Sequence, residues 1–188
     1  MKIDRVATMA ESVSGEKQYH YRNDNDIAGT VHYVLDGNNQ QRPFYSFARA
    51  FNVDHNNPDE VARMIVENQA VHNKTKGIRM RHEFAVISKS ELDECSHREQ
   101  IICIADKYSD YFHYAGFRAA YGVFDCGDYY RIDYVIDPVN YHDGSKYRYN
   151  QQEIRAQEQE QLKTVVSAIR QGTEDKVDLQ HLRYYPYF

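Results

Sequence analysis

The stretch that decides the fold is Tyr129-Tyr-Arg-Ile-Asp-Tyr-Val-Ile-Asp137, in which two kinds of side chain alternate. Successive side chains of a strand point to opposite faces of a sheet. One face therefore receives an apolar set suited to a core under helices: Tyr130, Ile132, Tyr134 and Ile136. The other face begins with Tyr129, Arg131 and Asp133, which predicts either a solvated surface or the floor of a site.

The sequence on either side of this strand predicts an antiparallel arrangement. Phe117–Phe124 reads as a strand joined to it by Asp125-Cys-Gly-Asp128, a connection typical of a hairpin. Further strands are expected over Lys2–Met9 and Arg81–Ser88. Helices are expected over Asp26–Leu35, Asn57–His72, Ser90–Tyr111 and Gln151–Arg170. We predict an α+β fold with a central antiparallel sheet of about four or five strands and helices packed on one face.

Length and composition limit the class of protein. The 188 residues predict one domain over 1–150, with a C-terminal helix and aromatic tail over 151–188 packing on it. No apolar run approaches the roughly 18–20 residues of a spanning helix, and no secretory signal is recognisable, so we expect a cytoplasmic protein without a membrane partner. The cysteines Cys95, Cys103 and Cys126 form no C-x-x-C pair, so neither a disulfide framework nor a structural zinc site is expected.

The charge distribution identifies candidate nucleic-acid contacts. A net charge of −5 argues against a general nucleic-acid coat. Four cations without an acid nevertheless lie between His72 and His82: Lys74, Lys76, Arg79 and Arg81. Lys146 and Arg148 alternate with tyrosines, a pattern that suits single-stranded DNA because cations hold phosphates and aromatic rings stack on bases.

Three motifs in order resemble those of the MobA/MobL-type relaxases, the mobilisation nucleases of plasmids and conjugative transposons. Ile27–Leu35 is similar to the helix that carries the family's nucleophilic tyrosine, which falls on Tyr33. Asn73–Gly77 with Arg81–Ser88 is similar to the second motif, whose histidine falls on His82. Asp128–Asn140, followed by a segment from His142 to Arg148, is similar to the third motif.

The resemblance implies a relaxase-like (HUH-type) fold and binding of single-stranded origin-of-transfer DNA in conjugation. It further implies an endonuclease in which Tyr33 attacks a phosphodiester to give a covalent intermediate. Other proteins of the transfer complex would be partners. In the family, a histidine cluster holds a divalent metal such as Mg²⁺ or Mn²⁺ that polarises the phosphate.

This chain departs from the family at the metal site, because the histidine positions of the third motif hold Tyr129, Arg131 and Asp133. Arginine stays charged and only donates hydrogen bonds, so the histidine cluster cannot form, and the cofactor is left open. Two interpretations follow. Either Arg131 replaces the metal's charge at the phosphate with Asp133 orienting it, or catalysis is lost and the fold is kept for binding DNA or a transfer partner. We assign His82 and Tyr129 to the floor of the site; the alternative for His82 is a hydrogen-bonded strand histidine without a role in the site.

Overall fold

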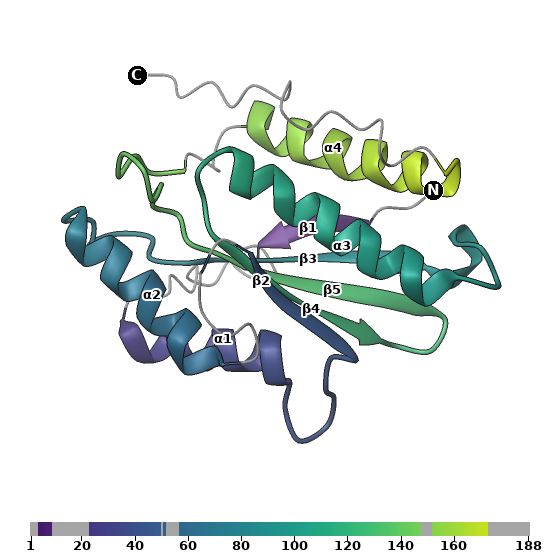
Figure 1. Cartoon of the computed structure of the whole chain (residues 1–188), viewed down its shortest axis with the longest axis horizontal. Coiled ribbons are helices and arrows are strands. Elements are labelled where there is room, and N and C mark those ends of the chain that lie inside the picture. The colour runs from purple at the N-terminus through teal and green to yellow at the C-terminus, as the bar shows by residue number, and fades with distance from the viewer. Residues whose placement is uncertain (1–3, 9–22, 50, 52–56, 148–151, 173–188) are drawn as a thin grey trace, which may run out of the picture.

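The computed structural model describes residues 4–8, 23–49, 51, 57–147 and 152–172. Helices and strands follow one another as a mixed α+β chain (Figure 1). The elements are β1 (Asp4–Thr8), α1 (Asp24–Asp36), β2 (Tyr45–Arg49), α2 (Pro58–Val71), β3 (Arg81–Ser88), a short 3-10 helix η1 (Lys89–Glu91), α3 (His97–Tyr114), β4 (Ala119–Asp125), β5 (Tyr129–Ile136) and α4 (Gln152–Arg170).

The strands form one five-stranded sheet in the order β1-β3-β5-β4-β2, with every neighbouring pair antiparallel. The expected antiparallel sheet and the β4–β5 hairpin are therefore confirmed. β5 is the middle strand, so side chains on both of its faces are flanked by β3 and β4. Because β5 is central, its polar residues lie between residues of β3 and residues of β4.

Helices cover both faces of the sheet, so the expectation of helices on one face is wrong (Figure 1). Tyr130, Ile132, Tyr134 and Ile136 point into a core beneath α3 and α4, as predicted. On the other face Val135 is buried under α1 and α2. The sequence pattern does not predict this second helical layer. Ala120 and Gly122 of β4 face α1, but they are small residues and so do not indicate a buried sheet face.

Gly122 allows α1 to lie unusually close to the sheet. A Cβ atom at this position would overlap the backbone carbonyl oxygen of Val34 in α1. Gly122 is paired with Asp133 of β5, so the close approach brings the C-terminal half of α1 directly over the polar residues of that strand. The position of Tyr33, one residue before Val34, is set by this contact.

Caps define the helices of this second layer. Asn23 accepts a hydrogen bond from the backbone N–H of Asp26 and so caps α1, which begins two residues before the expected start at Asp26. Gly37, with a φ of 79°, ends α1. Asn57 caps α2 through the backbone N–H of Glu60, and the helix begins at Pro58, in agreement with the expected range Asn57–His72.

One strand was not expected, and two other expectations differ from the structure or lie beyond it. The sequence did not predict β2. The helix expected from Ser90 is η1 followed by a turn, and α3 begins only at His97, because the Asp93 side chain accepts the backbone N–H of Cys95. The aromatic tail lies outside the described residues.

None of the helices within the described ranges has the length and apolar character needed to cross a membrane.

Candidate functional site

The structure brings together Tyr33 of α1, His82 of β3, and Arg131 and Asp133 of β5. An Nη2 hydrogen of Arg131 is donated to the Tyr33 hydroxyl oxygen. Arg131 Nε donates to Asp133 Oδ2 at 2.9 Å, and His82 Nε2 lies 3.5 Å from Asp133 Oδ1. Four residues chosen from sequence motifs thus form one connected polar cluster on the α1 side of the sheet.

Phe124 holds the two residues at the surface of this cluster in place. Its ring stacks on the Tyr33 ring, with centroids 5.8 Å apart and an interplanar angle of 17°. The Arg131 guanidinium carbon lies 5.0 Å from the centre of the same ring. Sequence reasoning missed Phe124, although the hairpin turn places it opposite Arg131 in the register of the strands. Counting back across the turn would have found it.

Burial decreases from the inner to the outer side of the cluster. The side chains of His82 and Asp133 are each 4% exposed, whereas that of Arg131 is 27% exposed. Asp133 therefore lies beneath Arg131 and fixes its guanidinium from the protein side. An anion arriving from solvent would meet Arg131 before it met Asp133.

The Tyr33 phenol is a protonated group at neutral pH. Burial raises its pKa above the ordinary value of 10.0, and the nearby Asp133 carboxylate raises it further, while Arg131 acts in the opposite direction. A neutral phenol is a weak nucleophile, so any attack by its oxygen requires a base to remove the proton. Asp133 is the carboxylate close enough to perturb it.

Tyr129 lies at the edge of this cluster and points away from the core. It belongs to the same face of β5 as Arg131 and Asp133, and 41% of the residue is exposed. Its cross-strand partner is Ser88 of β3. The structure therefore places Tyr129 at the rim of the site rather than on its floor.

The residues present do not fit the divalent metal that the relaxase resemblance implies. Arg131 occupies the middle histidine position, and its guanidinium already uses Asp133 as an acceptor. A metal ion there would be held next to a fixed positive charge. Within the described ranges, no group of three or more His, Cys, Asp or Glu side chains is arranged to bind a metal.

Two of the predicted DNA-contacting cations are buried and form ion pairs within the protein. Arg81 is buried on the α4 side of the sheet, where it forms ion pairs with Glu83 and, at 2.7 Å, with Glu158. The Arg79 side chain is 8% exposed and forms an ion pair with Asp24 at 2.5 Å. We therefore leave both out of the candidate DNA-contacting surface.

The other predicted cations lie together at the far end of β5. Lys74 and Lys76 are exposed on the turn between α2 and β3, and Lys146 Nζ donates to the Lys76 carbonyl oxygen at 2.5 Å. Burial and the nearby charges of Lys74 and Arg79 lower the pKa of Lys146, so this turn is locally positive. It is separated from Arg131 by most of β5, about 20 Å at roughly 3.3 Å per residue. Arg148 lies outside the described residues.

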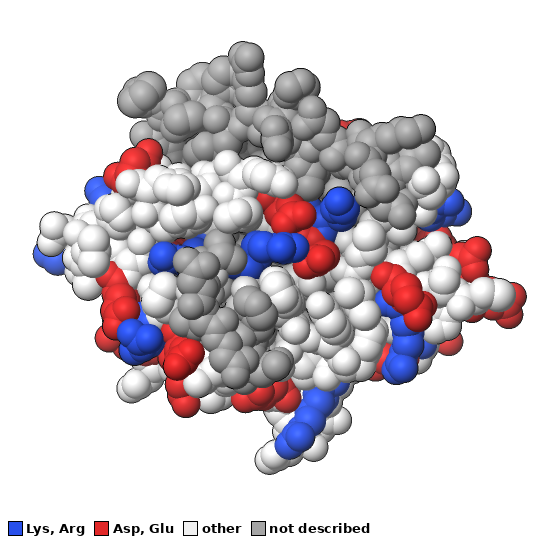
Figure 2. All heavy atoms as spheres, viewed as in Figure 1, with Lys and Arg blue, Asp and Glu red and all other residues white. Residues whose placement is uncertain are grey.

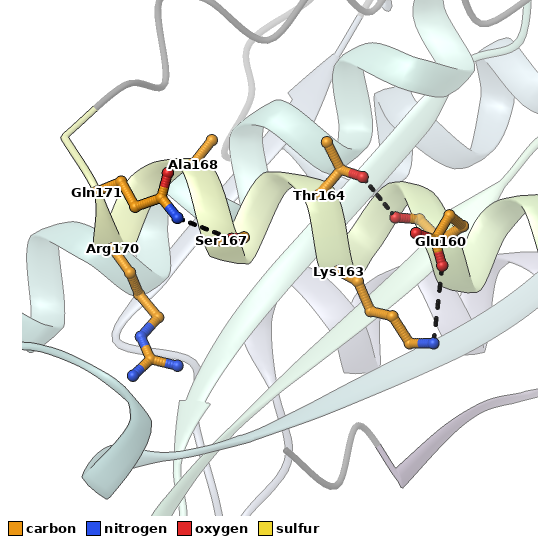
Figure 3. Close-up of a pocket in the computed structure, with 7 residues that line it drawn as sticks. All are labelled: Glu160, Lys163, Thr164, Ser167, Ala168, Arg170 and Gln171. Atoms are coloured by element: carbon orange, nitrogen blue, oxygen red, sulfur yellow. Dashed lines mark hydrogen bonds and ion pairs between the residues drawn. The ribbon is translucent and has the colours of Figure 1, made fainter.

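Two other surface features do not add to the site. The face of the molecule in Figure 2 carries intermixed basic and acidic side chains rather than one basic patch. A hollow of about 770 Å³ is lined by polar residues of one side of α4, including Glu160, Lys163 and Ser167 (Figure 3). Since α4 packs on the opposite face of the sheet from α1, this hollow is remote from Tyr33.

Comparison with known proteins gives no relative from which a function can be transferred: no protein family, no curated protein and no solved structure matches this chain.

Proposed function

We propose that this protein binds single-stranded DNA, such as an origin-of-transfer strand, and joins it covalently to Tyr33, in the manner of a divergent relaxase. The observation that carries the proposal is the contact between the Tyr33 hydroxyl and the Arg131 guanidinium. It places a potential nucleophile next to a permanent cation that can bind a phosphate. The same two positions match the nucleophile and metal-site motifs of the relaxases in sequence.

Arg131 has the hydrogen-bonding capacity that this role requires. A guanidinium carries five N–H donors, and the contacts to Asp133 and Tyr33 use two of them. The remaining donors and the partial exposure of the side chain are compatible with a phosphate oxygen binding at Arg131. Phe124 and Asp133 hold the guanidinium from two sides, so little side-chain ordering would accompany binding.

The proposed reaction is a transesterification. The Tyr33 oxygen forms a bond to phosphorus, and the bond between phosphorus and the 3′ oxygen breaks. Asp133 takes the phenolic proton, and the released 3′ oxygen takes a proton from water. Arg131 stabilises the negative charge that develops on the phosphate oxygens, which is the task a metal performs in the resembling family. The protein-bound product carries the DNA that lay 3′ of the cleaved bond.

The test is a covalent adduct on a denaturing gel. The protein is incubated with a pool of random-sequence single-stranded oligonucleotides that carry a label at either the 3′ or the 5′ end. We expect an adduct that retains only the 3′ label and that forms in EDTA as well as in Mn²⁺.

Tyr33→Phe should remove the adduct, whereas the matched change Tyr114→Phe, at an exposed tyrosine of α3, should not. An adduct that persists in Tyr33→Phe would show that another residue is attacked. The absence of an adduct from the parent protein in every condition would refute the reaction.

A second candidate is DNA binding without cleavage. It is favoured by the ion pair with Asp133, which already balances the charge of Arg131, and by the raised pKa of Tyr33. The same experiment separates the two candidates. Retention of the oligonucleotide pool on a filter, together with a complete lack of adduct, would identify a non-catalytic DNA-binding protein.

A further inference from the structure

A strip of sheet surface lies next to the Tyr33–Arg131 contact. Here β3 and β5 present pairs of residues toward the α1 side: Ser88 with Tyr129, Val86 with Arg131, and Phe84 with Asp133. The three β3 residues are only partly buried. α1 contacts β4, β5 and β2, and Tyr33 lies over Phe124 and Arg131, so the strip extends beyond the helix toward β3.

Tyr129 is the exposed aromatic residue of this strip. With Tyr114 and Val71, it is one of three strongly exposed large hydrophobic residues in the described ranges. Its side chain is on the same face as that of Arg131, two residues along the strand, which corresponds to roughly 7 Å. An exposed aromatic ring and a partly exposed guanidinium thus lie side by side on one sheet face. This arrangement suits the binding of a single strand, because the ring stacks on a base while the cation holds the phosphate.

We propose that Tyr129 is a base-stacking platform, so that the site takes a DNA strand with an unpaired base on Tyr129 and the neighbouring phosphate at Arg131. This inference rests on the proposed function for the identity of the strand as DNA. It excludes duplex DNA as the substrate, because the faces of a paired base are already stacked within the helix.

The surrounding charges give the bound strand a direction. On the hairpin side of Tyr129, Asp128 is exposed and Asp125 is paired with Lys89 at 2.7 Å. The charge of Asp125 is balanced by Lys89, so it is the exposed Asp128 carboxylate that disfavours a phosphate on that side of the ring. The phosphate next to the stacked base therefore lies toward Arg131 and Tyr33, and the base on Tyr129 belongs to a nucleotide adjoining the phosphate that Tyr33 would attack.

The test measures binding of a twelve-residue oligothymidylate that contains one 2-aminopurine, whose fluorescence falls when the base stacks. We expect Tyr129→Ala to weaken binding on the order of tenfold and to abolish the fluorescence quenching, because an aromatic–base stack contributes that much to affinity. Tyr129→Phe keeps the ring and should behave as the parent protein. The matched control, Tyr114→Ala, removes another exposed tyrosine and should leave both readings unchanged.

The possible results separate this inference from the proposed function. Equal affinity and equal quenching for Tyr129→Ala and Tyr114→Ala would overturn the inference even if Tyr33 still forms an adduct. A loss specific to Tyr129→Ala with no adduct from any protein would support the stacking platform and refute the cleavage reaction. Binding of the oligonucleotide annealed to its complement as tightly as the single strand would overturn the exclusion of duplex, and failure to bind either would refute both proposals.

Discussion

Asp137 is a buried carboxylate that fastens α2 to the end of β5. Its Oδ2 accepts a hydrogen bond from Asn68 Nδ2 at 2.7 Å, and its Oδ1 accepts one from Gln69 Nε2 at 3.3 Å. The backbone N–H of Val139 donates to it as well. Burial raises the pKa of Asp137 to about 6, although these hydrogen bonds act to lower it.

The raised pKa of Asp137 predicts a pH-dependent stability with a definite sign. The folded state binds this proton more tightly than the unfolded chain, so the stabilising contribution is present below the ordinary value of 3.8 and is lost as pH rises through about 6. Asp137→Asn removes this titration. Between pH 4 and pH 7 the free energy of unfolding of the variant should rise relative to the parent by up to about 3 kcal/mol.

Asp143 provides the control, with the opposite sign. Hydrogen bonding from Ser145 lowers the pKa of this exposed carboxylate, so its stabilising contribution is lost as pH falls. Urea denaturation of both Asn variants at a series of pH values measures the two trends. If the Asp137→Asn difference is flat with pH, the carboxyl is not perturbed in the folded protein.

Individual residues also show which parts of the candidate site could be predicted from the sequence and which could not. Tyr33, His82, Arg131 and Asp133 could be chosen from motifs, and they meet in the structure. Arg81 could not be judged from its basic neighbours, because its ion-pair partner Glu158 is distant in sequence and lies on α4. A run of cations in the sequence does not reveal which of them face solvent, since alternate strand residues point to opposite faces.

At the scale of elements, the contact between α1 and β4 predicts opposite effects for two glycine substitutions. Gly122→Ala places a methyl group against the backbone of Val34, so α1 must shift, which should cost about 1–3 kcal/mol of stability. Gly29→Ala lies on the exposed side of α1 with nothing within 4 Å, and should stabilise the protein by about 0.5–1 kcal/mol.

Thermal denaturation of the two variants compares these effects directly. Gly122→Ala should also slow the formation of any Tyr33 adduct, because the shift of α1 moves the phenol away from Arg131. Equal melting temperatures for the two variants would mean that α1 does not lie as close to β4 as the structure shows.

Most elements were predictable because their signals are local. The Asn-Pro start of α2, the alternation of β5 and the turn before it all act within a few residues. β2 was not predictable in the same way. It is five residues long at the edge of the sheet, and what makes it a strand is its pairing with β4, seventy or more residues later. The second helical layer was not predicted for a related reason. Gly122 allows α1 to pack closely on β4 because it has no side chain, and a missing side chain leaves no hydrophobic pattern in the sequence.

At the scale of the whole molecule, the candidate reaction site and the Lys74–Lys76 turn lie at opposite ends of β5. If one DNA strand reaches both, the lysines should affect affinity without affecting the chemical step. Neutralising Lys74 and Lys76 to alanine should lower the slope of log Kd against log salt by about 1.4, because each phosphate of a single strand that a lysine neutralises contributes roughly 0.7 to it. Salt titrations by fluorescence anisotropy measure this slope.

The control for this charge change lies on α4. Lys163→Ala combined with Arg170→Ala removes the same number of charges from the opposite helical layer, and should leave the slope unchanged. The same decrease in both double variants would show that only net charge matters. No decrease in either would remove the lysine turn from the DNA-contacting surface.

The two helical layers also differ in what would be lost if one of them opened. The core beneath α1 and α2 and the core beneath α3 and α4 have no residue in common, because the sheet separates them. The first pair of helices can therefore detach in a partial opening while the sheet remains folded against the second pair. Such an opening would carry Tyr33 away and leave Arg131 uncovered on a folded sheet. The residue proposed to attack DNA thus lies on a helix that such an opening would release, whereas the residues proposed to hold DNA would stay on the folded sheet.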